Sequence, residues 1–374
     1  MRTVAGIYIH IPFCKRKCNY CDFYSCTSLE LAEPFLSALE REMELRREEL
    51  PVGPIATLYI GGGTPSLLTP VQADRLIGAV GRHWDCSALR ETTMEVNPDD
   101  VRGDYLEQIA RLGVDRLSIG LQSLVDGDLQ LLGRRHDTAK ALAAVAAARR
   151  AGFDNLSVDL IYGIPGMSLA RWGDNLRRVV DLDAPHISAY HLSVEEGTPL
   201  ASMVRRGELT EVDEDQSGEQ FDLLCRTLGE AGYEHYEISS FARPGFRAVH
   251  NSAYWSGEPY LGLGPSAHSY DGRRRSWNVA STEGYIEGGD IRQGEELGER
   301  ERYNEYVMTA LRRIEGVDMA TLRRLFGPRQ ASYFERCATE QVQKGRLLRG
   351  GDNYRIDEPN MLVSNEIIAS LFSI

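Results

Sequence analysis

The distribution of hydrophobic residues along this chain predicts six short strands that alternate with helices. The strand-like runs are GIYIHI, TLYIGG, TTMEV, RLSIGL, LSVDLIYG and HISAYHLSV, which begin near residues 6, 57, 92, 116, 156 and 186. Helix-like patterns lie between them, at residues 29–50, 70–83, 104–112, 136–151 and 168–181. This alternation predicts a parallel sheet with helical crossovers. Nearly continuous apolar runs are typical of such strands, because helices cover both faces of the sheet. The pattern fits an open doubly wound sheet or a curved partial barrel.

The remaining chain has a different pattern. Residues 213–231 predict an amphipathic helix, and residues 301–374 predict helices followed by a hairpin with a Gly-Gly-Asp-Asn turn. A chain of 374 residues is long for one domain. We therefore expect a strand–helix domain at residues 1–205, an extension over its mouth at residues 206–300, and a winged-helix-like domain at residues 301–374.

Composition and charge narrow the class of protein. Hydrophobic residues make up 42% of the chain and charged residues 26%, as in ordinary globular proteins. The net charge of −13 and a pI near 5.2 argue against a nucleic-acid partner, which prefers a basic surface. No apolar run has the roughly 18–20 residues of a membrane-spanning helix, and the N-terminus has no apolar targeting segment. These features predict a cytoplasmic protein whose seven cysteines stay reduced.

Polar residues or glycines stand at the carboxyl ends of all six predicted strands. In barrels of this kind, function is found at that end. These strand-end residues are Cys14, Gly61–Ser66, Glu95–Pro98, Gln122, Asp159, Tyr190 and His191. Each has an ordinary structural explanation when taken alone, but their gathering on one face predicts a functional site.

The first strand is followed by a group of closely spaced cysteines. Cys14, Cys18 and Cys21 form a C-x3-C-x2-C run, and Phe23 occupies the position where a fourth ligand could stand. A structural zinc site needs four ligands, usually from two separated pairs; Cys26 is nearby, but a second C-x2-C pair is absent from the sequence. The crowding favours an iron–sulfur cluster, which takes several thiolates from one loop. Three cysteines would leave one iron of a four-iron cluster open to a small molecule.

A second motif, HNSAYW, spans residues 250–255. A neutral imidazole such as that of His250 ligates heme iron well. Asn251 could hydrogen-bond the other ring nitrogen, while Tyr254 and Trp255 could cover a porphyrin face. The alternative is a hydrogen-bonded histidine in a turn beside core aromatic residues.

Together these strings resemble the radical S-adenosylmethionine superfamily. The resemblance rests on the cysteine run after YIHIPFC, on LYIGGGTPS after the second strand, and on EVNP, GLQS, VDLIYGIPG, YEISSFARPG and GLGPSAHSY. It spans nearly the whole chain and is strongest toward the group of oxygen-independent coproporphyrinogen III oxidases and related heme chaperones. The resemblance implies an α/β fold with a partial (β/α)6 barrel. It also implies a [4Fe-4S] cluster, S-adenosylmethionine bound to its fourth iron, and an electron donor.

The resemblance assigns site residues one by one. Cys14, Cys18 and Cys21 are the implied cluster ligands. The residues that it assigns to S-adenosylmethionine are Tyr8, Tyr20, Gly62, Gly63, Thr64, Glu95, Gln122, Arg134 and Asp159. Their chemistry is suitable, because an aromatic ring stacks on adenine, glycines admit close backbone approach, and carboxylates and arginine form strong polar contacts. Arg135 is an alternative to its neighbour Arg134. In the heme chaperones the H-N-x-x-Y-W motif, here His250, Asn251, Tyr254 and Trp255, is associated with heme.

Two departures separate this chain from the oxidases. The oxidases have a fourth cysteine at the position of Phe23, and several tens of residues precede their first strand. The resemblance therefore favours a heme chaperone that passes heme to apo-hemoproteins, including respiratory acceptors reached through peripheral membrane contact. It assigns no catalytic residue. The alternative is an enzyme that oxidatively decarboxylates coproporphyrinogen III, and a third hypothesis is a radical enzyme with another substrate.

Overall fold

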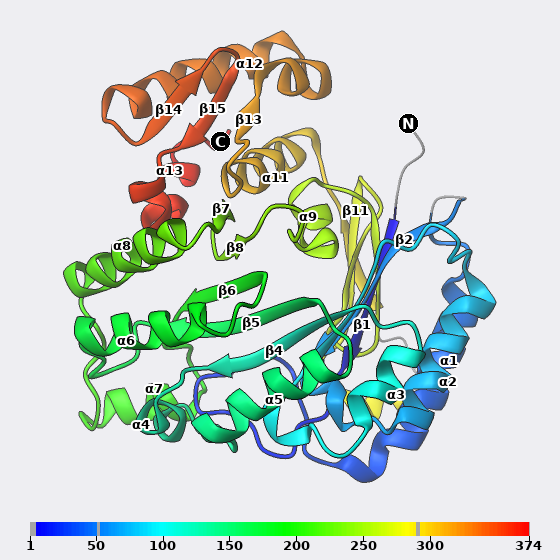
Figure 1. Cartoon of the computed structure of the whole chain (residues 1–374). Coiled ribbons are helices and arrows are strands. Elements are labelled where there is room, and N and C mark those ends of the chain that lie inside the picture. The colour runs from blue at the N-terminus through cyan, green and yellow to red at the C-terminus, as the bar shows by residue number, and fades with distance from the viewer. Residues whose placement is uncertain (1–4, 51–52, 289–291, 374) are drawn as a thin grey trace.

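The fold is built on one long mixed sheet. The computed structural model describes residues 5–50, 53–288 and 292–373. Twelve strands are joined in the order β12-β11-β10-β9-β1-β2-β3-β4-β5-β6-β8-β7. The six central strands are parallel: β1 Ala5–Ile11, β2 Ile55–Gly62, β3 Glu91–Val96, β4 Arg116–Gln122, β5 Asn155–Tyr162 and β6 His186–His191. These strands curve around a common interior, and β1 and β6 pair with other strands instead of each other, so the barrel is open (Figure 1). The predicted α/β fold with a partial six-stranded barrel is confirmed.

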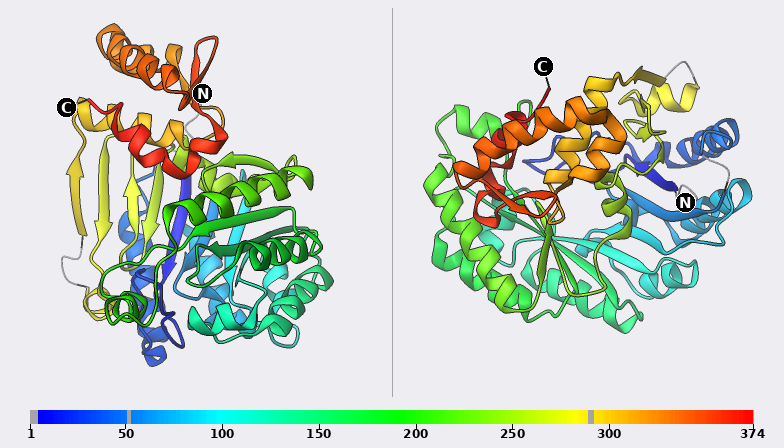
Figure 2. Two further views of the ribbon diagram at one scale, coloured as in Figure 1. Left: turned by 90° about the vertical axis from the view of Figure 1, so that its left-hand side faces the viewer. Right: turned by 90° about the horizontal axis from the view of Figure 1, so that it is seen from above.

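Helices cover the outer face of these strands (Figure 2). The five predicted ones are α1 Ala32–Arg46, α2 Pro70–His83, α3 Tyr105–Arg111, α5 Thr138–Arg150 and α6 Leu169–Val180. The start of α2 follows from its sequence, because Thr69 and Gln72 form a reciprocal capping box and Pro70 suits the first helical turn. Within the barrel region, the short helices α4 Asp126–Leu131 and α7 Pro199–Arg205 escaped prediction.

The first strand shows how the sheet separates core from site. Ile7, Ile9 and Ile11 are fully buried in the hydrophobic core. Successive side chains of a strand point to opposite faces, so the intervening Tyr8 and His10 turn toward the barrel interior, where their side chains are hydrogen-bonded. The interior of the barrel is therefore polar, whereas the layer between sheet and helices is apolar.

Residues 206–300 differ from the expected extension over the barrel mouth. After α8 Glu214–Glu230, they widen the sheet at both edges with β7 Glu234–Glu237, β8 Ser240–Ala242, β9 Tyr260–Leu263, β10 His268–Tyr270, β11 Arg274–Asn278 and β12 Arg292–Glu296. Helix α10 Thr282–Glu287 meets the cysteine loop through the Tyr24 hydroxyl. Helix α9 Val249–Trp255 lies at the opposite end, where β2 and β3 begin, because Glu91 accepts hydrogen bonds from its first backbone N–H groups.

The C-terminal residues form a small separate layer on the barrel. Its elements are α11 Glu299–Leu311, β13 Val317–Asp318, α12 Met319–Gln343 with a kink at Gly327, β14 Leu347–Gly350, β15 Asn353–Ile356, η4 Glu358–Val363 and α13 Ser364–Ala369. In this module helices are followed by the β14–β15 hairpin, and its winged-helix-like character stays a prediction. The module sits at the end of the barrel opposite the cysteine loop (Figure 1).

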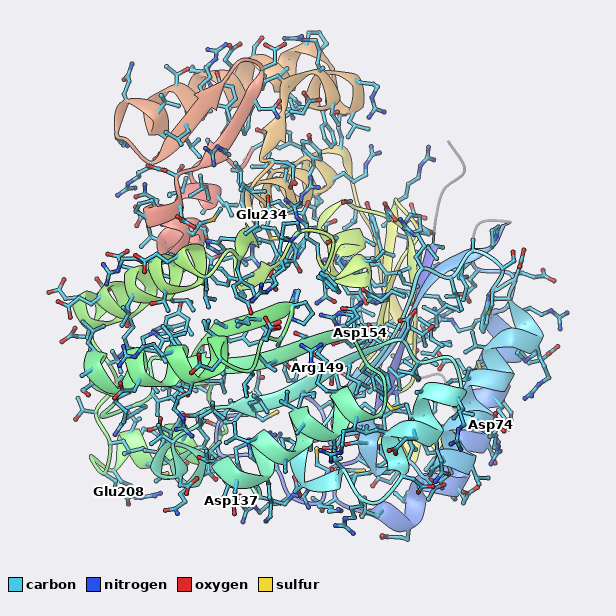
Figure 3. All side chains as sticks on the ribbon, in the orientation of Figure 1. Asp74, Asp137, Arg149, Asp154, Glu208 and Glu234 are labelled. Carbon is cyan, nitrogen blue, oxygen red and sulfur yellow. The ribbon has the colours of Figure 1, made fainter. Side chains whose placement is uncertain are left out.

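Charged side chains cover the outside of the molecule, among them the exposed Asp74, Asp137 and Glu208 labelled in Figure 3. Within the residues that the structure describes, no helix has the length and apolar character needed to cross a bilayer.

Candidate functional site

A cavity of about 440 Å³ opens at the carboxyl ends of the six parallel strands. All three cysteines of the C-x3-C-x2-C run line it. Eight of the nine residues assigned to S-adenosylmethionine line it too: Tyr20, Gly62, Gly63, Thr64, Glu95, Gln122, Arg134 and Asp159. The ninth, Tyr8, lies deeper in the barrel, where its hydroxyl is 3.1 Å from Nδ1 of His10. The fold thus gathers residues that are up to 145 positions apart, from Cys14 to Asp159, around one space.

Main-chain hydrogen bonds hold the cysteine loop closed. The Cys14 N–H donates to the Cys26 carbonyl at 2.9 Å, and the Cys26 N–H donates to the Pro12 carbonyl at 2.7 Å. On the other side, the Asn19 N–H donates to the Leu132 carbonyl at 3.0 Å. These main-chain bonds fix both sides of the loop that carries the three thiols.

The thiols fit a multi-iron cluster better than a single metal ion. Burial raises the pKa of Cys14 and raises that of Cys21 to about 11, so thiolates here need a nearby cation. A tetrahedral zinc ion would hold its sulfurs roughly 3.8 Å apart, given Zn–S bonds of about 2.3 Å. Within the described residues, these three cysteines do not form a group whose ligand atoms all lie within 4.8 Å. Wider spacing suits thiolates that bind separate irons of one cluster.

The glycine-rich loop packs directly on the cysteine loop. Gly62 has φ of +108°, and a Cβ there would lie 2.6 Å from the His10 ring. A Cβ at Gly63 would lie 2.8 Å from the Phe13 carbonyl oxygen. Glycine is required at both positions for this approach. The contact brings Thr64 Oγ1 to 3.4 Å from Cys14 Sγ.

Two interior carboxyl groups form the floor of the cavity. Glu95 accepts hydrogen bonds from the Tyr59 hydroxyl at 2.9 Å and from the Gly62 N–H at 3.0 Å. Burial raises the pKa of Glu95 to about 7, and the nearby Asp159 adds to this effect. Asp159 accepts from the Ser118 hydroxyl at 3.0 Å, and burial raises its pKa as well.

Arg134, rather than Arg135, faces the cavity. Its Nη2 donates to Asn97 Oδ1 at 2.6 Å and to the Gly120 carbonyl at 2.9 Å, while Nη1 lies 3.5 Å from Cys18 Sγ. Arg135 instead pairs with acidic residues that follow β3. The guanidinium of Arg134 is thus fixed beside a cysteine, where it favours negative charge.

The backbone at Gln122 is in a left-handed conformation, with φ of +65°. Non-glycine residues rarely adopt it, and such positions cluster at functional sites. The conformation ends β4 and places Gln122 in the lining of the cavity. Tyr20 comes from the cysteine loop on the other side.

The HNSAYW motif lies away from this cavity. The His250 side chain is only 1% exposed. Its Nδ1 is 2.8 Å from Thr57 Oγ1, and its Nε2 is 2.7 Å from the Tyr254 hydroxyl. Thr57 therefore has the role that we expected for Asn251. From Thr57 to Gly62, strand β2 rises roughly 17 Å, which separates the motif from the cavity.

Burial lowers the pKa of His250 to about 3, and the positive charge of Arg116 adds to this effect. The imidazole is therefore neutral, which is the form that ligates iron. Trp255 is only partly buried and lies beneath the Arg312 guanidinium, 5.6 Å from its ring centre. Both ring nitrogens of His250 have partners, so an iron ion would have to displace one of them.

Sequence reasoning missed Ser118 of the cavity, and it named Asn97, Tyr190 and Phe23 without assigning them a contact there. Asn97, which accepts from Arg134, stood within the EVNP string, and Ser118 holds Asp159. Phe23 is 68% exposed and lines the cavity, as does Tyr190, which is 47% exposed. Because its side chain is exposed, Phe23 is not a core residue.

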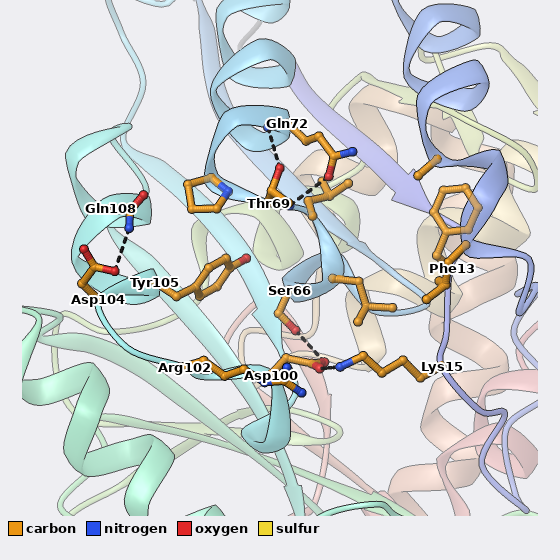
Figure 4. A pocket seen from close by; sticks show the side chains of 15 residues that line it. Phe13, Lys15, Ser66, Thr69, Gln72, Asp100, Arg102, Asp104, Tyr105 and Gln108 are labelled. Atoms are coloured by element: carbon orange, nitrogen blue, oxygen red, sulfur yellow. Dashed lines mark hydrogen bonds and ion pairs between the residues drawn. The ribbon is translucent and has the colours of Figure 1, made fainter.

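A neighbouring cavity of about 550 Å³ lies between α2, α3 and the cysteine loop (Figure 4). None of the residues assigned to the cluster, S-adenosylmethionine or heme lines it, although Ser66 from the end of the second strand does. Lys15 reaches into it to pair with Asp100 at 2.5 Å, and the Ser66 hydroxyl donates to the same carboxylate at 3.3 Å. The positive charge of Lys15 therefore pairs with the Asp100 carboxylate and not with the thiols of the cysteine loop.

The open barrel, the three-cysteine loop and the polar cavity between them define a radical S-adenosylmethionine protein. The model of the Radical SAM superfamily matches residues 8–179. Coproporphyrinogen III oxidase (HemN) from Escherichia coli has the same fold, with a TM-score of 0.85, 22% sequence identity, and coverage of 100% of this chain and 91% of that chain. Proteins of this superfamily use a [4Fe-4S] cluster and S-adenosylmethionine.

Similar proteins with curated names narrow the assignment from the superfamily to one family. Heme chaperone HemW from Bacillus subtilis is 33% identical over 371 residues, which are 97% of this chain and 98% of that protein. Heme chaperone HemW from Mycobacterium tuberculosis is 38% identical over 330 residues, 85% of this chain and 84% of that protein. Radical S-adenosyl methionine domain-containing protein 1, mitochondrial, from Danio rerio is 36% identical over 265 residues, 71% of this chain and 60% of that protein. The chain belongs to the HemW family.

The protonation state of Glu95 predicts that S-adenosylmethionine affinity depends on pH. If its carboxylate accepts hydrogen bonds from the cofactor, S-adenosylmethionine affinity falls as pH drops through the pKa of about 7, because the group takes up a proton. The loss approaches about tenfold per pH unit below that value. Isothermal titration calorimetry of cluster-loaded protein between about pH 8 and about pH 6 measures it. Glu95→Gln should bind weakly at every pH, whereas the surface control Glu208→Gln should follow the wild type. A wild-type affinity that does not change with pH would contradict this role.

Proposed function

We propose that this protein is a heme chaperone that binds a [4Fe-4S] cluster, S-adenosylmethionine and heme, and transfers the heme to apo-hemoproteins. The observation that carries the proposal is the match to Heme chaperone HemW from Bacillus subtilis over 98% of that protein's length. Its partners are heme, apo-hemoprotein acceptors, including respiratory ones reached at a membrane surface, and an electron donor for the cluster.

The chain has a binding site for the cluster and another for S-adenosylmethionine. Cys14, Cys18 and Cys21 hold the cluster. The cavity beside them holds S-adenosylmethionine, with Arg134 and Glu95 as its charged contacts. When bound, the cluster supplies single electrons to S-adenosylmethionine. Arg134 favours negative charge near Cys18, and the Tyr59 hydroxyl and the Gly62 N–H orient the Glu95 carboxylate.

For heme we propose the His250 end of the barrel. The imidazole is neutral, and Thr57 fixes its Nδ1, as is usual for ligating histidines. Heme binding would require the Tyr254 hydroxyl to leave Nε2. Tyr254 and Trp255 are both partly exposed on α9, so a porphyrin has an apolar surface nearby.

Phe23 supports the chaperone over the oxidase. The residue stands where the oxidases carry a fourth cysteine, and its ring is largely exposed at the cavity. An exposed phenylalanine costs solubility and brings no ligand to the cluster. Its position is therefore better explained by contact with an apolar ligand or partner than by packing.

Heme delivery is the direct test. Heme-loaded protein, with cluster content verified, is mixed anaerobically with a respiratory apo-cytochrome b, and holo-cytochrome is followed by its absorbance. We expect faster loading than from serum albumin carrying the same amount of heme, because a chaperone recognises its acceptor. Equal rates from both donors would mean that heme passes through solution and would contradict the proposal.

The second candidate function is oxidative decarboxylation of coproporphyrinogen III. It is favoured by the complete cavity and by the fold shared with the Escherichia coli oxidase. Anaerobic incubation of cluster-loaded protein with S-adenosylmethionine, a reductant and coproporphyrinogen III tests it. We expect no protoporphyrinogen. Product formed over several turnovers would make the protein an oxidase. Phe23 would then no longer distinguish a chaperone from an oxidase.

A further inference from the structure

Three metal-binding side chains meet where the C-terminal module touches the barrel. Cys225 belongs to α8, His235 to β7 and Glu358 to the start of η4. Their ligand atoms all lie within 4.8 Å of one another. His235 Nδ1 is 3.0 Å from Glu358 Oε1 and 3.9 Å from Cys225 Sγ. The segment η4, which begins at Glu358, contacts α8, and the C-terminal module lies next to α8 in Figure 1.

The histidine is held in the orientation that a ligand needs. Its ring stacks on Phe241 with centroids 4.2 Å apart and planes 12° apart. Its Nε2 lies 3.4 Å from the Ile238 carbonyl oxygen, to which an Nε2–H can donate. Ligating histidines commonly donate their second N–H in this way, which leaves the other nitrogen for the metal. Here that nitrogen is Nδ1, and it faces both Cys225 and Glu358.

The distances suit one ion after a small adjustment. With bonds of about 2.3 Å to sulfur and about 2.0–2.1 Å to nitrogen or oxygen, tetrahedral ligands lie roughly 3.3–3.6 Å apart. The observed 3.0 Å and 3.9 Å bracket this range. A shift of a few tenths of an ångström at the half-exposed Glu358 would bring its distance from His235 into this range, and a similar shift of the Cys225 sulfur would do the same for the other distance.

The electrostatics also favour a cation. Burial raises the pKa of Cys225 to about 12, and the negative charges of Glu358 and Asp222 contribute, so the thiol keeps its proton until a cation arrives. The positive charge of Arg355, which acts on Glu358, opposes the binding of a cation.

We propose that Cys225, His235 and Glu358 bind one divalent transition-metal ion of the zinc type, which ties the C-terminal module to the barrel. One sulfur, one nitrogen and one oxygen ligand select such an ion over magnesium or calcium. Three protein ligands leave a fourth position for water. The site is independent of the proposed heme chaperone function and of the cluster loop.

Cobalt(II) is the probe for this site. Protein with a fully reconstituted cluster and verified iron content, so that the loop cysteines are occupied, is titrated anaerobically with Co²⁺. We expect one Co²⁺ per chain, with thiolate-to-cobalt charge transfer and the visible bands of a four-coordinate ion. Metal that binds only the folded state should also raise the melting temperature.

Two variants and a control decide the outcome. Cys225→Ser should lose the charge-transfer band and bind Co²⁺ at least about tenfold more weakly, and Glu358→Gln should weaken binding while keeping the band. Cys337→Ser, at a half-buried cysteine on α12, should behave as the wild type. Circular dichroism and iron content confirm folding of each variant. The absence of Co²⁺ binding by the wild type, or an unchanged spectrum in Cys225→Ser, would overturn the proposal.

Discussion

Cys18→Ser is expected to lose the visible absorbance of the iron–sulfur cluster after anaerobic reconstitution, whereas Cys26→Ser is expected to keep it. Both cysteines belong to the same loop, and both are partly buried. Cys18 lines the cavity beside Arg134. Cys26 does not line the cavity, and its thiol accepts instead from the Thr282 hydroxyl at 3.7 Å. Serine is a poor ligand for iron but a close steric match for cysteine.

The comparison separates ligation from loop folding. The main-chain bonds between Cys14, Cys26 and Pro12 do not involve the Cys18 side chain, so the loop keeps its shape in the Cys18 variant. Iron and sulfide content, the absorbance spectrum and the electron paramagnetic resonance signal of the reduced protein measure the outcome. A Cys18→Ser protein with a full complement of iron and sulfide would show that another residue is the ligand. A loss in both variants would point to a folding defect.

His250→Ala is expected to weaken heme binding by at least about tenfold, or 1.4 kcal/mol, and to leave the cluster intact. The imidazole would be the axial ligand, and it lies far from the cysteine loop. The substitution also leaves the Thr57 and Tyr254 hydroxyls without their partner. Leaving buried polar groups unpaired costs roughly 1–3 kcal/mol each, so a lower melting temperature is expected as well. Heme titration followed by absorbance, with a melting curve for each variant, measures both effects.

Two further variants distinguish a ligand from a structural histidine. Tyr254→Phe frees Nε2 of His250 while keeping the ring that packs on it. If His250 ligates iron, heme affinity should be equal or higher in this variant, because no hydroxyl competes for the nitrogen. His191→Ala tests the other end of the barrel, since His191 lines the cavity. Loss of heme binding only in the His191 variant would move the heme to the cavity and contradict the role of His250.

The central strands could be predicted because their sequences are governed by burial. Strands β1–β6 are apolar runs that helices cover. The predicted helix at residues 70–83 coincides with α2 because the sequence TPVQ, residues 69–72, contains the capping residues that start it. The edge strands could not be predicted from their sequences. Strand β12, RQGEE, has no hydrophobic residue and is fully exposed, and its partner β11 is RRSWN. Such strands form through backbone pairing with a neighbour already in place.

The same distinction applies to the site. The residues around the cavity could be predicted because they follow strands, and parallel strands end on one side. The place of the HNSAYW motif could not, because it depends on contacts of α9 with Thr57 and Glu91, which are 193 and 159 positions away from His250. Nothing in a short helix indicates which end of a barrel it will contact. Similarly, the meeting of Cys225 with Glu358 depends on how the C-terminal module docks.

The long open sheet carries a consequence for how this protein behaves in solution at high concentration. An unpaired strand at a sheet border is a template for aggregation. At one border, β7 is covered by the chain at residues 312–313. The Ile238 N–H, which follows β7, donates to the Arg312 carbonyl, and the backbones of Glu237 and Arg313 form an antiparallel β-bridge. At the other, β12 is short and rich in charge. Replacing its glutamates with threonine or valine would remove charged side chains that discourage a second copy from pairing with this edge.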